Sequence, residues 1–191
     1  MTNGSANEIA SLISLVQSPF GDDASLRVRE EYVRRLIAVG SDAEERVSQI
    51  VKSGDATNLP ALMDVLATFG SKNAADVLRA KLEAGPEGVS EAAANALLRH
   101  PTRWALEALS EALQSENTLV VLSALVALRQ VGGFDRCDIL MPLLRSADRR
   151  IRFHAVHLAW QTGCLQADAV RALLPLESDP EIRELLTTLA A

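Results

Sequence analysis

Two histidines, His154 and His157, have the residue type and the spacing that come nearest to a metal site. Side chains three positions apart share one face of a helix, so both imidazoles could bind the same ion. A zinc site needs three or four ligands, and no third or fourth ligand is evident near this pair. We therefore expect no metal and no cofactor, and we interpret both histidines as solvated or stacking side chains.

No residue in this sequence is a clear candidate for a catalytic nucleophile. Cys137 and Cys164 are an isolated pair without metal-ligand spacing, and cysteines of this kind in a cytosolic protein are most often buried free thiols. Ser, His and Asp are present without a nucleophile elbow or a Cys–His context, and each Gly is placed to close a helix rather than to cradle a phosphate. We expect two free thiols and a protein that is not an enzyme.

Arginine clusters could contact phosphate groups at two places in the chain. Acidic residues surround the first cluster, and Glu30 precedes Arg34 by four residues, a spacing that favours an ion pair on a helix. The net charge of −6 disfavours nucleic acid and anionic membranes, which attract basic surfaces. We expect ion pairing rather than nucleic-acid binding at Arg27, Arg29, Arg34, Arg35, Arg149, Arg150 and Arg152.

The amino-acid composition indicates which kind of secondary structure holds these side chains in place. The chain has 191 residues, of which 48% are hydrophobic and only 4% aromatic. Ala and Leu, both strong helix formers, are abundant, and β-branched residues dominate no segment, so we predict an all-α fold. No apolar run reaches the ~18 residues that span a bilayer. Residues 1–6 are small and polar, unlike a secretory signal, and we expect a flexible N-terminus and a cytoplasmic location.

The predicted helices form a repeat. One helix, with mostly apolar side chains at positions 0, 4, 7 and 8, recurs at intervals of 30 or 31 residues from Val28, Asn58, Val89, Val120, Ile151 and Ile182. A second helix with two apolar positions precedes each copy at the same period, and such pairs bury their apolar faces only by stacking. We predict one domain over residues 7–191, an α-solenoid of six helix pairs: 7–40, 41–70, 71–101, 102–132, 133–163 and 164–191.

The helix copies resemble one known repeat family. The segment from Asp148 to Gly163 is similar to HEAT repeats, and most similar to the phycobilisome-lyase-type HEAT-like repeat of bacteria, through Asp148, Ile151, Arg152, Ala155, Leu158 and Gly163. The copies at Asp179 and Val28 match less fully, and the three middle units lack the Arg. The resemblance implies an armadillo-type α-solenoid whose members mostly serve as protein-binding scaffolds; fold alone does not determine function.

One face of the repeated helix carries apolar residues in some units, although this face should be exposed to solvent. Positions 2, 6 and 9 lie opposite the core, on the side that is concave in HEAT arrays, and most units place polar residues there. Units three to five instead place apolar and aromatic residues there, beside an arginine and a histidine, as a protein-interaction site would. The candidate partner-binding residues are Leu98, Leu122, Val126, Arg129, Phe153, His157 and Trp160.

These observations favour a cytoplasmic bacterial scaffold that binds another protein of unknown identity and acts on no substrate. Burial of the same residues by a curved array, or by a second copy in a homodimer, is the alternative for this surface. A phycobilin-lyase-like subunit that handles a chromophore and a phycobiliprotein, and a HEAT protein that binds DNA lesions, are the alternative functions. Polar outer faces on the first and last helices predict capping units and a complete array.

Overall fold

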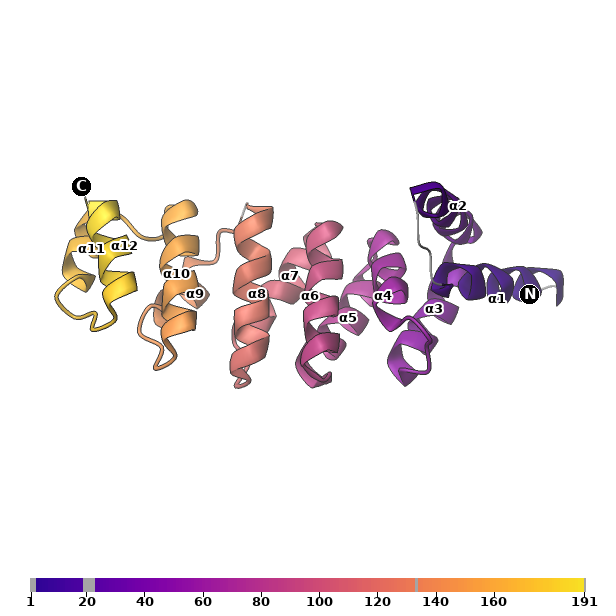
Figure 1. Cartoon of the computed structure of the whole chain (residues 1–191), viewed down its shortest axis with the longest axis horizontal. Coiled ribbons are helices and arrows are strands. Elements are labelled where there is room, and N and C mark those ends of the chain that lie inside the picture. The colour runs from indigo at the N-terminus through magenta and orange to yellow at the C-terminus, as the bar shows by residue number, and fades with distance from the viewer. Residues whose placement is uncertain (1–2, 19–22, 133, 191) are drawn as a thin grey trace. The chain divides into compact units, whose positions relative to one another are not determined.

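The computed structural model describes residues 3–18, 23–132 and 134–190, and within these ranges every regular element is an α-helix. The predicted all-α fold is confirmed, and the helices follow one another as hairpins (Figure 1). No helix in these ranges is both long enough and apolar enough to cross a membrane. The sequence predicts a single domain, but the contacts within the chain group it into two compact units, Met1–Ala105 and Leu106–Ala191. The boundary between them falls inside α7 (Arg103–Ala112).

The N-terminal unit contains three helical hairpins. The first helix begins at Asn3, four residues before the expected domain boundary at residue 7. The hairpins are α1 and α2, α3 and α4, and α5 and α6, with bounds Asn3–Gln17, Asp23–Val39, Ser41–Ser53, Leu59–Thr68, Lys72–Ala84 and Glu87–Arg99.

The first hairpin departs from the repeat. The regular pattern packs second helices on one another, as α4 does on α6, but it is mainly α1 rather than α2 that packs against α4 (Figure 1). Helix α2 lacks the apolar column for that contact: Val28 is 45% exposed and Arg35 is exposed. Helix α1 supplies buried apolar residues instead, including Leu12 and Val16. The assignment of Val28 to the core was therefore wrong.

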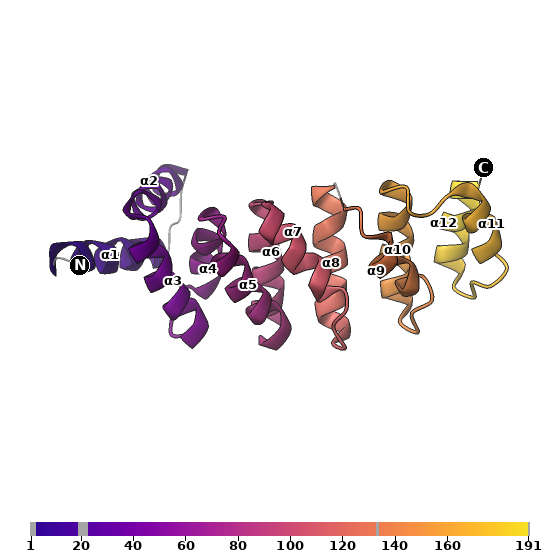
Figure 2. The same ribbon diagram turned by 180° about the vertical axis from the view of Figure 1, so that it is seen from behind.

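The C-terminal unit holds most of α7 and five further helices, whose bounds are α8 Thr118–Val131, α9 Cys137–Leu143, α10 Arg149–Gln161, α11 Ala167–Leu173 and α12 Pro180–Ala190. Helices α8, α10 and α12 form one layer, nearer the viewer in Figure 1, and α9 and α11 lie behind them, as Figure 2 shows. The predicted apolar column of the second helices is buried where α8 packs on α10, with Ala124, Leu128, Ala155 and Leu158 all at 0% exposure. The solenoid pattern of stacked hairpins is thus confirmed within this unit.

Local signals set the helix ends of this unit. Asn117 and Asp148 cap α8 and α10, because each side chain accepts a hydrogen bond from a backbone N–H of the first turn, at 3.0 and 2.8 Å. Asp179 does the same for α12, which begins at Pro180. Gly132 follows α8 with a positive φ of 73°, a conformation that a residue with a Cβ adopts at a cost.

The cysteines contradict the expectation of two free thiols. Cys137, the first residue of α9, and Cys164, just after α10, form a disulfide with a Cα–Cα distance of 5.3 Å, and both are half-buried. Cysteines 27 residues apart have no sequence signal for pairing. They meet because α9 and α10 pack as a hairpin, which brings the start of the first helix beside the end of the second.

Candidate functional site

The candidate residues are divided between the two compact units. Leu98 lies on α6 of the N-terminal unit, where it is half-buried. The other six lie on two helices of the C-terminal unit that pack side by side, α8 and α10, and together with His154 they form what we call the α8–α10 surface: Leu122, Val126, Arg129, Phe153, His154, His157 and Trp160.

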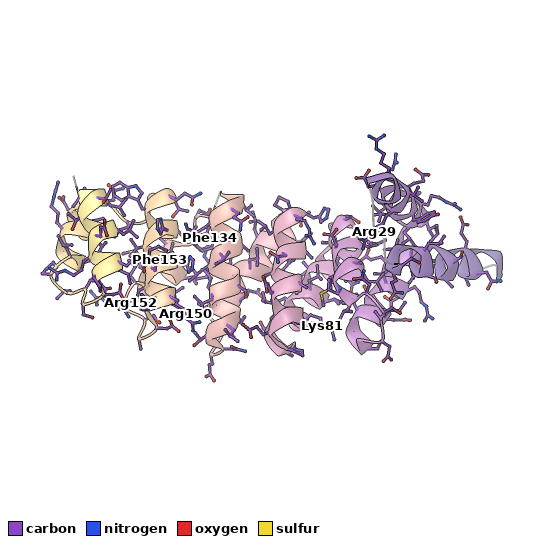
Figure 3. The ribbon with its side chains drawn as sticks, viewed as in Figure 1. Arg29, Lys81, Phe134, Arg150, Arg152 and Phe153 are labelled. Atoms are coloured by element: carbon purple, nitrogen blue, oxygen red, sulfur yellow. A yellow bond between two sulfur atoms is a disulfide. The ribbon has the colours of Figure 1, made fainter. Side chains whose placement is uncertain are left out.

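The α8–α10 surface is open to solvent in this chain. Val126 is 38% exposed and Trp160 is 39% exposed, although both are large apolar side chains. Phe153, which projects from α10 in Figure 3, is half-buried, as are Leu122 and His157. None of the seven predicted residues is buried, so the protein's own core does not account for their apolar character.

Helix periodicity explains why these side chains share one face. The core positions of α8 and α10, such as Ala124 and Ala155, point into the C-terminal unit and are fully buried. The residues two, six and nine positions after Val120 in α8, and after Ile151 in α10, lie on the opposite face of each helix, because a helix has 3.6 residues per turn. The contact between α8 and α10 then places the two rows side by side.

A polar contact crosses from one helix to the other within this surface. The Nη1 atom of Arg129 lies 2.7 Å from Nδ1 of His154. Since a guanidinium only donates, Nδ1 of His154 accepts this bond, and the imidazole is neutral with its proton on Nε2. Gln161, near the end of α10, donates from Nε2 to the backbone carbonyl of Arg129 at 3.1 Å.

The aromatic ring of Phe153 contacts both histidine rings of α10. Phe153 meets His157 at an edge-to-face angle of 69° with 4.8 Å between ring centroids, and meets His154 at 85° and 5.5 Å. Both histidines therefore contact Phe153 edge to face. Among the described residues, no three His, Cys, Asp or Glu side chains gather to hold a metal ion.

The surroundings of Arg129 lower the proton affinity of all three basic groups. Burial is the main reason that the pKa of His154 lies below 6.5, and the charges of Arg129 and His157 lower it further. Burial and then the charge of Arg129 lower the pKa of His157, and burial lowers the pKa of Arg129 from its ordinary value. At neutral pH the surface thus presents two neutral imidazoles and one cation.

Acidification is expected to destabilise the C-terminal unit before its carboxylates titrate. Both histidines have a lower pKa in the folded chain, so the unfolded chain binds more protons as the pH falls through about 6.5. The free energy of unfolding should therefore fall between about pH 7.5 and about pH 5.5, as measured by urea unfolding. The double variant His154→Gln/His157→Gln should show a flatter dependence; an unchanged slope would contradict this account.

The remaining arginines of α10 are paired within the unit. Arg149 lies 3.2 Å from Asp179 and 3.5 Å from Glu181, and Arg150 lies 2.9 Å from Asp148. In the first cluster Arg35 pairs with Glu8 at 2.7 Å, and Arg34 pairs with Glu31 at 3.1 Å instead of with the expected Glu30. Ion pairing is therefore observed for Arg34, Arg35, Arg149 and Arg150, and it stays a prediction for Arg27 and Arg29.

Arg152 makes the most extensive ionic contact among the described residues of this unit. Its Nε and Nη2 atoms donate to the two carboxylate oxygens of Glu177, both at 2.9 Å, and Nη1 donates to the carbonyls of Ser146 and Ala147. The hydrogen bond from Arg152 is the largest of the effects that lower the pKa of Glu177. Arg152 lies on the lower part of α10 in Figure 3, and its contacts with Ser146 and Glu177 join one hairpin to the next.

Sequence reasoning named His154 but did not connect it with Arg129, and it missed Gln161 and Glu177. His154 occupies position 3 of its helix, off the predicted row, and only the packing of α10 against α8 brings it to Arg129. Gln161 and Glu177 belong to no motif or repeat position that would have indicated their contacts. The Arg at the HEAT-like position was a usable signal that Arg152 would bridge hairpins, but the sequence did not indicate its acceptor.

No family model matches the chain, and no curated protein sequence matches it. The crystal structure of an engineered protein is similar, at 16% identity and a TM-score of 0.48, over 100% of this chain and 91% of that one. The complex of CpcE and CpcF of phycocyanin lyase from Nostoc sp. PCC7120 is similar at 17% identity and a TM-score of 0.45, over 93% and 74% of the two chains. TM-scores of this size support no conclusion about family or activity.

Proposed function

We propose that this protein is a non-catalytic scaffold that binds another protein through the α8–α10 surface. The observation that carries the proposal is the exposure of Trp160 and Val126 beside a half-buried Phe153, on a face that its own unit leaves uncovered. Exposed aromatic side chains next to an arginine are typical of the anchors that dominate protein interfaces. A scaffold of this kind needs no cofactor, and we propose none.

Substituting Phe153 and Trp160 together by alanine is expected to abolish capture of the partner from extract of the protein's own cells. An aromatic anchor contributes about 2 kcal/mol or more, so affinity should fall at least about 30-fold. Both side chains contact solvent, and the far-ultraviolet circular dichroism of the variant should match that of the parent.

A matched control uses apolar side chains of the same unit that lie away from this surface. Leu176 is 73% exposed and Met141 is 36% exposed, and both line an open groove of about 700 Å³ between α9 and α11. The Met141→Ala/Leu176→Ala variant should retain the partner. Loss of capture in the control variant alone would place the binding site on the α9–α11 side and refute the proposal.

Self-association is the alternative occupant of the α8–α10 surface. A homodimer that covers Trp160 would make the mass in solution twice that of the chain, and the Phe153→Ala/Trp160→Ala variant would revert to the mass of one chain. Light scattering of both proteins distinguishes this result from binding of a different partner.

Two further functions from the sequence remain predictions. A phycobilin-lyase-like role requires a source organism that makes phycobilisomes, so a genome without them would remove this alternative. A role in binding DNA lesions predicts a salt-sensitive mobility shift with duplex DNA. The ion pairs made by Arg149, Arg150 and Arg152 leave these side chains engaged with carboxylates of the chain itself, which disfavours the second alternative.

A further inference from the structure

The two helices of the α8–α10 surface carry charge of one sign. The 14 residues of α8 and the 13 residues of α10 include four arginines and two histidines and no Asp or Glu. The chain as a whole has the opposite balance, with 25 acidic residues and 19 Lys or Arg. An anionic group approaching this face therefore meets no repelling carboxylate from either helix.

Only one of the four arginines is without a carboxylate in the described part of the chain. Arg149, Arg150 and Arg152 each pair with one or more carboxylates of the C-terminal unit. Arg129 makes no such pair there, and its guanidinium donates from Nη1 to the neutral ring of His154. A guanidinium has five N–H donors, so Arg129 retains donors for another acceptor.

Arg129 is half-buried, so leaving its positive charge without an anion costs free energy. An anion that pairs with it is bound more strongly than it would be at a fully hydrated arginine. The guanidinium of Arg129 is half-buried among the side chains of the surface, and the loss of hydration lowers its pKa. Val126 and Trp160 bring apolar surface to the same face. In surroundings of low dielectric constant, a carboxylate that accepts two parallel N–H bonds from a guanidinium is bound more strongly than a neutral acceptor.

We infer that the partner of the α8–α10 surface presents an acidic segment, with a carboxylate that pairs with Arg129 and an apolar or aromatic side chain that packs on Phe153 and Trp160. This inference rests on the proposed function and adds the chemistry of the partner to it. The neutral acceptor that Arg129 now uses, Nδ1 of His154, is one that a carboxylate can replace or complement. Outside these two helices, Glu184 of α12, which packs against α10, is exposed and restricts where the acidic group can lie.

A protein carboxylate fits this surface better than a nucleic-acid phosphate. Nucleic-acid binding depends on several cations that neutralise successive phosphates, whereas three of the four arginines of α8 and α10 already pair with carboxylates. The flanking side chains are apolar, and the net charge of −6 repels a polyanion at long range. A segment that carries one acidic and one aromatic side chain matches both parts of the surface.

A pair of small probes tests this inference with the intact chain. 3-Phenylpropionate carries an aromatic ring and a carboxylate, and 3-phenylpropanamide has the same shape without the charge. Titrations followed by amide and indole nuclear magnetic resonance shifts should show the carboxylate binding about fivefold more tightly than the amide, since charged hydrogen bonds are the stronger ones. The largest shifts should arise at the indole of Trp160 and at neighbouring amides.

Three variants assign the preference to Arg129. Arg129→Gln should bind the two probes equally, and Arg129→Lys should restore part of the preference, because a lysine keeps the charge but loses the bidentate geometry. Arg149→Gln, which removes an exposed arginine from the same surface layer, should leave the fivefold preference intact.

The outcomes separate this inference from the proposed function. Equal binding of both probes to the parent chain, absence of binding at millimolar concentration, or a preference that survives Arg129→Gln would overturn the inference. Inorganic phosphate or a short DNA duplex that binds more tightly than 3-phenylpropionate and depends on Arg129 would also overturn it in favour of a phosphate ligand. In each case, partner capture that still depends on Phe153 and Trp160 would leave the scaffold function standing.

Discussion

Arg152→Met is expected to lower the free energy of unfolding of the C-terminal unit by about 3 kcal/mol. The side chains of Arg152 and Glu177 are only 16% and 9% exposed, and their two hydrogen bonds are each 2.9 Å long. Methionine fills similar space without charge, so the variant leaves the carboxylate of Glu177 poorly solvated and without its cation. It also leaves the carbonyl of Ser146 without its side-chain donor.

Urea unfolding measures this loss, and the same substitution one turn earlier supplies its control. Arg149→Met removes an arginine whose side chain is 61% exposed and whose pairs lie at 3.2 and 3.5 Å, so it should cost less than about 1 kcal/mol. Adding Glu177→Gln to Arg152→Met should recover part of the stability, because the unpaired charge is then removed. Equal losses for the two single variants would show that Arg152 is a surface pair like Arg149.

The pH dependence gives a second readout of the Arg152–Glu177 pair. Arg152 lowers the pKa of Glu177 in the folded chain, so this pair stabilises the protein above the ordinary pKa of a glutamate and ceases to do so as the pH falls. In Arg152→Met the pKa of Glu177 should rise toward or above its ordinary value. The variant should therefore lose less stability than the parent between about pH 5 and about pH 3.

Removing the Cys137–Cys164 disulfide is expected to lower the free energy of unfolding by about 3 kcal/mol. The bond closes a segment between cysteines 27 residues apart, and a cross-link over that length restricts the unfolded chain by roughly this amount. The Cys137→Ser/Cys164→Ser variant and the parent chain treated with dithiothreitol should lose similar stability in urea, while dithiothreitol should not change the variant.

Thiol labelling under denaturing conditions provides the direct check of this bond. The parent chain should incorporate no alkylating reagent before reduction and two equivalents after it, because Cys137 and Cys164 are its two cysteines. Two equivalents before reduction in freshly lysed, acid-quenched cells would restore the original expectation of free thiols. Disulfides are rare in the reducing cytosol, so labelling of the quenched cells also tests the cytoplasmic location expected from the sequence.

The periodic features of this protein were predictable because they depend on local chemistry. A column of mostly apolar residues every 30 or 31 positions predicted the succession of helix pairs, and local capping side chains such as Asn117, Asp148 and Asp179 set where helices begin. The same periodicity placed Phe153 and Trp160 on the face away from the core, since a 3.6-residue turn leaves few choices. Whether that face binds a partner stays a prediction.

The contacts that join one helical hairpin to the next were decided only by the tertiary structure. Arg129 reaches His154 and Arg152 reaches Glu177 across 25 residues, and the cysteines pair across 27, so none of these contacts follows from positions on a single helix. Each depends on the angle and the register at which one helix stacks on its neighbour. Helix α1 replaces α2 against α4 for the same reason, because burial of apolar surface summed over the packed helices outweighed the repeat pattern of the second helix.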